Sequence, residues 1–148
     1  MPYVIDKDPF VSAWRGEEDG KTAAKALEKL KEKLNDCEEK IYITRETHKL
    51  YLRILDEVNN RLREGPKLFP SLKLYMYWVQ SGKVKRINDS DLQQIDNEEC
   101  LQEQEDIPFV RLAKKFNAVL VTRDENIQNC AKKIGYTVVT PEQLSQDP

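Results

Sequence analysis

Short apolar runs that alternate with helical patterns restrict the fold of this sequence more than any other feature. Apolar runs at residues 3–5, 41–43, 84–87, 119–122 and 137–139 each have the length of a strand. Between most of them, apolar residues recur every three or four positions, which is the spacing of a helix with one buried face. Strands that alternate with helices predict a parallel sheet with helices on its faces. We therefore expect an α/β protein, a three-layer α/β/α sandwich around a central, mostly parallel sheet of four to five strands.

Residues that favour helix ends refine this prediction. The expected helices cover residues 21–34, the segment from Thr44 to about residue 63, and the apolar patterns at 109–116 and 127–134. Thr44 can accept a hydrogen bond from a free first-turn amide, and Gly135 can end the last of these helices. Pro9 is expected to interrupt the segment after the first strand. Residues 88–105 are acidic and poor in large apolar side chains, so we expect a short, largely solvated helix there.

Length and composition favour one cytoplasmic domain spanning 1–148. The chain has 148 residues, enough for a substantial core, and a formal net charge of only -2, which is not the charge of a globally basic nucleic-acid binder. No stretch approaches the ~20 apolar residues that span a membrane, and MPYVIDKDPF lacks the pattern of a secretory signal. Cys37, Cys100 and Cys130 are far apart and odd in number, so we expect neither a disulfide framework nor a zinc site.

Four acidic residues lie where the predicted strands and helices meet. Asp6 ends the first apolar run, and Asp124 lies two residues past the run at 119–122. Glu46 lies in the first turn of the helix after the second strand, and Asp106 precedes the apolar face of a later helix. The carboxyl ends of parallel strands meet at one edge of a sheet, where ligands bind. The four carboxylates are therefore expected to meet at that edge.

Such a cluster needs compensation for its charge. Two like charges ~4 Å apart repel by about 4 kcal/mol at an effective dielectric constant near 20, and raised pKa values or bound cations can offset this. Hard oxygen ligands without a partnering His or Cys suit Mg²⁺ or Mn²⁺. A pair of such ions can orient and activate a water for phosphodiester cleavage. The only histidine, His48, is then not required for catalysis.

Each acid also has a purely structural interpretation. Asp124 can cap the helix that begins near Asn126, and Asp106, just before Pro108, can cap another. Glu46 can be a first-turn acid that the helix dipole favours. Asp6 is the hardest to explain in this way, because a carboxylate that ends an apolar strand caps nothing obvious. The joint placement of all four favours a functional cluster.

Several stretches resemble the PIN-domain family of metal-dependent ribonucleases, which includes the VapC-type toxins. YVIDKDPFVSA resembles the opening strand of that family with its first metal-binding acid, Asp6. ITRETHKLYLRIL resembles the junction that carries the second acid, Glu46. DIPFVRLAKKFNAVLVTRDENI is the most specific match and carries over Asp106, Thr122 and Asp124, and YTVVTPEQL resembles the last strand.

The resemblance implies a metal-dependent endoribonuclease. Such an enzyme cleaves single-stranded RNA by metal-activated water, as the toxin of a toxin–antitoxin pair or as an RNA-processing nuclease. It further implies an antitoxin or other protein partner and a homodimer. Two features depart from the family pattern. First, Lys7 and Asp8 stand where the family usually has Thr-Asn. Second, residues 59–105 match the family poorly. Asp8 and Thr122 are expected to support the acidic site.

Basic residues near the same edge are candidates for contacts with RNA phosphates. They are Lys7, Arg15, Arg45 and Arg123. The aromatic side chains of Tyr75, Tyr77 and Trp78 are expected in the core or at a dimer surface rather than stacked on bases.

Two other functions remain open at this stage. One is a PIN-like module that binds RNA or protein without cleaving, which the Lys7-Asp8 departure favours. The other is a phosphatase of the haloacid-dehalogenase type, with Asp6 as nucleophile and Asp8 as acid/base. Against the phosphatase, Phe10 occupies the expected Thr/Val position, and Glu46 and Asp106 would have no role.

Overall fold

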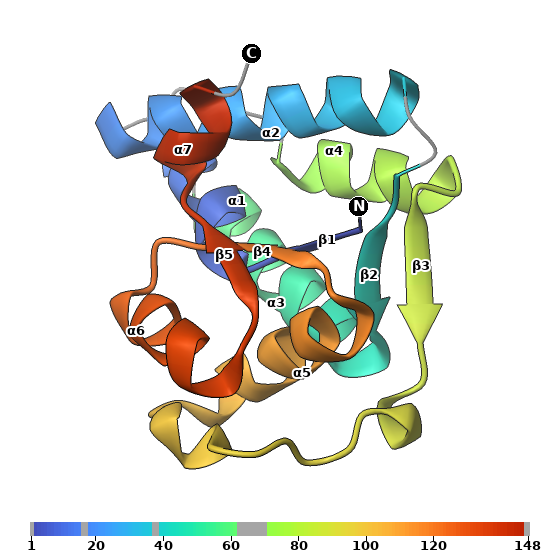
Figure 1. The fold of residues 1–148 in the computed structure, drawn as a ribbon. Helices are drawn as coiled ribbons and strands as arrows, with labels where there is room; N and C mark the ends of the chain where they lie inside the picture. The colour runs from blue at the N-terminus through green and yellow to red at the C-terminus, as the bar shows by residue number, and fades with distance from the viewer. Residues whose placement is uncertain (1, 16–17, 37–38, 62–70, 147–148) are drawn as a thin grey trace.

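A parallel sheet forms the centre of the computed structural model, which describes residues 2–15, 18–36, 39–61 and 71–146 (Figure 1). Within these residues the sheet has five strands in the order β3-β2-β1-β4-β5, and every neighbouring pair is parallel. The strands are β1 (Tyr3–Ile5), β2 (Ile41–Thr44), β3 (Val84–Ile87), β4 (Val119–Val121) and β5 (Thr137–Val139). The α/β class and the parallel sheet predicted from the sequence are confirmed.

Helices pack on both sides of this sheet. They are α1 (Lys7–Arg15), α2 (Glu18–Asp36), α3 (Arg45–Arg61), α4 (Ser71–Gln80), α5 (Ile107–Phe116), α6 (Glu125–Ile134) and α7 (Pro141–Gln146). In Figure 1, α2, α4 and α7 lie at the top of the view and α5 and α6 lie at the bottom, with the strands between them. None of the described helices is both long and apolar enough to cross a membrane.

A cluster of aromatic side chains lies next to the carboxyl end of β1. Phe10 of α1 packs edge-on against Tyr51, Tyr75 and Trp78, with ring centroids 5.4, 5.9 and 6.2 Å away. All four are buried. Tyr75 and Trp78 are therefore core residues, whereas Tyr77 is 46% exposed. The Tyr51 hydroxyl donates to the carbonyl of Ile5, which joins α3 to the end of β1.

Local signals explain most of the helix ends. Thr44 caps α3 as predicted, because its hydroxyl accepts from the Thr47 amide at 3.1 Å. The Thr47 hydroxyl accepts in return from the Thr44 amide at 2.8 Å. Gly135 ends α6 with a φ of 89°, a left-handed conformation that glycine adopts without strain. The predicted helix end near residue 63 lies outside the described residues.

Two segments differ from the sequence prediction. Pro9 does not interrupt the chain after β1, because it lies in the first turn of α1, where the missing amide hydrogen would have no partner. The acidic segment after β3 forms no α-helix. It forms three short 3₁₀ turns, η1 (Asp89–Asp91), η2 (Glu98–Cys100) and η3 (Gln104–Asp106). Its few apolar residues do not recur at the spacing that would pack one helical face.

A disulfide bond corrects the expectation for the cysteines. Cys100 and Cys130 are bonded, with their Cα atoms 5.9 Å apart, so η2 is joined to α6. The side-chain amide of Asn126 strengthens this link by donating from Nδ2 to the Cys100 carbonyl at 3.1 Å. The expectation that the cysteines form no disulfide is therefore wrong for this pair, and Cys37 lies outside the described residues. The acidic segment before α5 is held in place by this connection.

Candidate functional site

The pairing of β1 with β4 places two polar residues side by side at the carboxyl edge of the sheet. Ile5 pairs in register with Val121, so Asp6 and Thr122 follow as the next residues of their chains. The Thr122 hydroxyl donates to Asp6 Oδ2 at 2.7 Å, and the Asp6 amide donates to the Val121 carbonyl at 2.9 Å. Both side chains are buried. The position of Asp6 expected from the sequence is therefore the position that the structure gives it.

Asp8 joins this pair from the first turn of α1. One of its carboxylate oxygens lies 3.4 Å from Thr122 Oγ1, and the other accepts from the Arg123 amide at 3.3 Å. Burial, followed by the nearby carboxylate of Asp6, raises the pKa of Asp8 to about 8. At neutral pH Asp8 is therefore largely protonated, and the two acids share a reduced negative charge.

Asp106 reaches the same edge from a separate segment. It lies at the end of η3 and immediately precedes α5, but its side chain makes no capping hydrogen bond. The residue is 1% exposed. Its Oδ1 lies 3.4 Å from the ammonium nitrogen of Lys7, while its Oδ2 is buried without a hydrogen-bond partner among the described residues. The capping interpretation therefore does not account for Asp106.

The electrostatics of Asp106 place it in the cluster. Its pKa is raised to about 6, chiefly by burial, with the charge of Lys7 lowering it and the charges of Asp6 and Asp124 raising it. A buried carboxylate oxygen without a partner costs about 1–3 kcal/mol. A buried oxygen without a partner needs an explanation, such as a bound ion or a catalytic role. Asp106 is therefore the strongest functional candidate in the site.

Asp124 has a structural role that the sequence already suggested. Its Oδ1 accepts from the Ile127 amide at 3.0 Å and so caps α6. Its own amide donates to Thr122 Oγ1 at 3.0 Å, which holds it beside the pair formed by Asp6 and Thr122. Asp124 is half-buried, and its charge acts on Asp106. Capping and membership of the acidic cluster are thus compatible.

Removal of the Asp124 cap gives a first prediction. Asp124→Ala is expected to lower the free energy of unfolding by about 1 kcal/mol, because the Ile127 amide loses its acceptor. Asp124→Asn keeps an acceptor oxygen and is expected to lose much less. Urea denaturation of both variants measures the difference. Equal losses in the two variants would mean that the charge of Asp124, and not its cap, stabilises this part of the fold.

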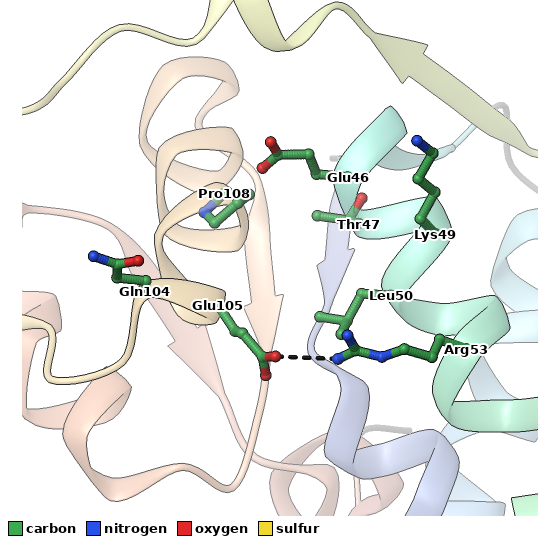
Figure 2. Close-up of a pocket in the computed structure, with 8 residues that line it drawn as sticks. All are labelled: Glu46, Thr47, Lys49, Leu50, Arg53, Gln104, Glu105 and Pro108. Carbon is green, nitrogen blue, oxygen red and sulfur yellow. Dashed lines mark hydrogen bonds and ion pairs between the residues drawn. The ribbon is translucent and has the colours of Figure 1, made fainter. Parts of the chain in front are cut away.

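Glu46 lies apart from the three aspartates. It is exposed in the first turn of α3 and lines a groove of about 390 Å³ between α3 and the start of α5. Figure 2 shows this groove, with Glu46 on one wall and Glu105 on the other, and with Arg53 reaching Glu105. Among the described residues, the charges of Asp6 and Asp124 act on Asp106, whereas Glu46 lies in the neighbouring groove and its charge acts on Arg111.

The four predicted phosphate contacts fall in different settings. Lys7 lies among the acids, and Arg45 is exposed at the start of α3. Arg123 pairs its guanidinium with Glu142 at 2.7 Å. The side chain of Arg15 lies outside the described part of the chain. Of the three that the structure describes, Lys7 has the closest connection to the candidate site.

Two residues near the site were not singled out from the sequence. Glu105 lies 3.9 Å from the Lys7 ammonium and 3.1 Å from Arg53, so it links the acidic cluster to the groove. Its only sequence signal is its position next to Asp106. The pKa of Tyr136 is raised by burial and then by the charges of Asp106 and Asp124, which places its ring near both acids. Nothing in the local pattern around Tyr136 indicates this.

A divalent ion fits this donor set only with water as a further ligand. Among the described residues no group of three Asp, Glu, His or Cys side chains is arranged to hold a metal ion. Mg²⁺, however, is commonly bound through one or two carboxylates and keeps several waters. Asp6 and Asp106 have the right chemistry, and the unpartnered Oδ2 of Asp106 is an available ligand atom.

Comparisons with known proteins add no assignment. No family model matches the chain, and the search of curated proteins gives no match.

Proposed function

We propose that this protein is a metal-dependent endoribonuclease that hydrolyses phosphodiester bonds of single-stranded RNA at the edge formed by Asp6 and Asp106. The observation that carries the proposal is the buried Asp106 carboxylate, which caps no helix and leaves one oxygen without a partner. It lies within the electrostatic reach of Asp6, at the sheet edge where α/β proteins bind their ligands.

The residues of the site have distinct proposed roles. Asp6 and Asp106 would hold Mg²⁺ or Mn²⁺, and the bound ion would supply an activated water and stabilise charge on the phosphate. Thr122 fixes the orientation of Asp6 through its 2.7 Å hydrogen bond. Asp8 holds a proton beside Asp6 and limits the repulsion between the acids. Asp124 contributes negative charge from the start of α6.

The RNA strand is proposed to run along the basic residues around this edge. Arg45 and Arg123 would contact its phosphates, as would Lys7 when it leaves Asp106. The resemblance to PIN-domain ribonucleases in the sequences around Asp6 and Asp106 supports this substrate class. It also supports a role as a toxin or an RNA-processing nuclease, with an antitoxin-like protein or a second copy of the chain as partner.

Cleavage of a labelled single-stranded RNA of mixed sequence tests the proposal. The purified chain is expected to cut the RNA with Mg²⁺ or Mn²⁺ and not with EDTA. Because water and not the ribose 2′-hydroxyl is the nucleophile, the products should carry no 2′,3′-cyclic phosphate. Cyclic ends, or cutting that persists in EDTA, would point to a contaminating metal-independent ribonuclease. Intact RNA under every metal condition, with folded protein, would reject the proposed activity.

A phosphatase remains the second candidate because of one observation. Asp8 has a pKa of about 8 and lies two residues from Asp6, which suits a general acid beside a nucleophilic carboxylate. Release of p-nitrophenol from p-nitrophenyl phosphate, lost in Asp8→Asn, would favour this alternative. Hydrolysis of RNA without any such release would favour the nuclease.

A binding module without activity is favoured by the ion pair between Lys7 and Asp106. This pair leaves one of the proposed metal ligands already engaged by a cation. Measurable RNA binding by fluorescence anisotropy, together with no cleavage under any metal condition, would support the binding module.

A further inference from the structure

The first residue of α1 carries a positive charge into the acidic cluster. The Lys7 ammonium nitrogen lies 3.4 Å from Asp106 Oδ1 and 3.9 Å from Glu105 Oε2. The backbone amide of the same residue donates to Asp6 Oδ1 at 2.8 Å. The side chain is 23% exposed, so most of its length is covered by protein. Lys7 therefore touches the two proposed metal ligands, one through its backbone and the other through its side chain.

Lys7 is placed to neutralise this cluster in the absence of any other cation. The charges that act on its ammonium come from Asp6, Asp106 and Glu105. The guanidinium of Arg123, another nearby cation, is engaged with Glu142 at 2.7 Å and influences Asp8. The ammonium of Lys7 thus brings a single positive charge to Asp106 and within the field of Asp6, where a divalent ion held by both carboxylates would bring two.

Lys7 provides a partner for only one of the two carboxylate oxygens of Asp106. Oδ1 of Asp106 faces the ammonium, but Oδ2 is buried without a partner among the described residues. A point charge on a flexible stem approaches one oxygen of a carboxylate, whereas a metal ion with its waters can engage both. The same carboxylate is therefore suited to a second, competing cation.

We infer that Lys7 is a tethered cation that competes with a divalent metal ion for Asp106 and Asp6, and so sets the metal affinity of the site. This inference rests on the proposed function only for the identity of the ion. With Lys7 in place, the acids are held together without metal. An ion binds only when the ammonium leaves Asp106, and its 23% exposed side chain gives it a path to solvent. Two cations cannot occupy the same carboxylate edge without strong repulsion.

Titration with Mn²⁺ in the absence of RNA tests the inference on the full chain. Free Mn²⁺ is followed by electron paramagnetic resonance for the wild type, Lys7→Met and Lys7→Arg. Lys7→Met keeps a similar length without charge and is expected to bind Mn²⁺ about tenfold more tightly or better. Lys7→Arg keeps the charge and is expected to stay near the wild type. Equal or weaker binding by Lys7→Met would overturn the inference, as would the absence of Mn²⁺ binding in all three proteins.

A measurement on the wild type guards against a variant that fails to fold. Acetylation of lysines by a water-soluble reagent, followed by mass spectrometry, reports how accessible each amine is. Saturating Mg²⁺ is expected to raise the reactivity of Lys7 about threefold or more, because its ammonium is released from Asp106. The exposed Lys49 and Lys114 serve as internal controls that should not change. Unchanged reactivity of Lys7 at a saturating Mg²⁺ concentration would contradict the competition.

The outcomes separate this inference from the proposed nuclease. Tighter Mn²⁺ binding by Lys7→Met without RNA cleavage by any variant would keep the competition and reject the nuclease. Metal-dependent cleavage together with unchanged Mn²⁺ affinity in Lys7→Met would keep the nuclease and reject the competition.

Discussion

Asp106→Asn is expected to lower the rate of RNA cleavage by about 100-fold or more, whereas Glu46→Gln is expected to lower it by less than about fivefold. The asparagine keeps the shape of the side chain but loses the negative charge, and its amide group replaces one potential ligand oxygen with a donor. Asp106 is buried in the acidic cluster, while Glu46 is exposed in the groove beside it. Single-turnover cleavage of labelled RNA at saturating Mg²⁺ measures both variants against the wild type.

The contrast between these two variants decides which arrangement of acids is the working one. Each substitution removes one carboxylate charge, so a general loss of negative charge would affect both alike. Urea denaturation must show that both variants stay folded. If Glu46→Gln loses as much activity as Asp106→Asn, the cluster of four acids expected from the sequence forms when metal or RNA binds, and α3 moves to bring Glu46 in. A normal rate in Asp106→Asn would instead remove the central ligand of the proposed site.

The sequence predicts those parts of the site that depend on strand ends. Asp6 and Thr122 are placed correctly because each directly follows a buried strand, and neighbouring parallel strands leave little freedom at their ends. The capping interpretation that the sequence offers for Asp124 is confirmed, because its side chain caps α6. The side-chain direction of Glu46 is harder to predict from the sequence. A shift of one position in the predicted start of a helix turns a first-turn side chain by about 100°.

Other features depend on contacts between distant segments, which spacing along the chain does not reveal. Cys100 and Cys130 are 30 positions apart and have no motif, yet the fold of the acidic segment brings them together. Lys7 was expected to face a phosphate, but η3 brings Asp106 and Glu105 to it from 99 and 98 positions away in the numbering. Tyr136 and the aromatic cluster around Phe10 are likewise tertiary effects. Local patterns predicted the five strands and helices α2, α3, α5 and α6. The packing of these elements determined the charges around the site.

The free energy of unfolding is expected to fall by about 4 kcal/mol between pH 5.5 and pH 8.5 in EDTA. Asp8 and Asp106 have folded-state pKa values of about 8 and about 6, above the ordinary value of 3.8. Over this interval the folded chain therefore binds more protons than the unfolded chain, and stability decreases as the pH rises. His48 opposes this trend slightly. Burial lowers its pKa, so the unfolded chain binds the histidine proton more tightly, and this one group stabilises the folded state as the pH rises. Urea midpoints at closely spaced pH values give the slope.

Asp8→Asn provides the matched control, because asparagine cannot acquire a charge. Its side-chain oxygen can still accept from the Arg123 amide, and its amide can donate to Asp6, so the local hydrogen bonds are preserved. The variant should therefore lose most of the pH dependence and should be more stable than the wild type at pH 8.5. A slope that persists in Asp8→Asn would assign the excess protons to other groups. Stability that rises with pH in the wild type would mean that Asp6, Asp8 and Asp106 are not crowded as described, and the cluster itself would then be in question.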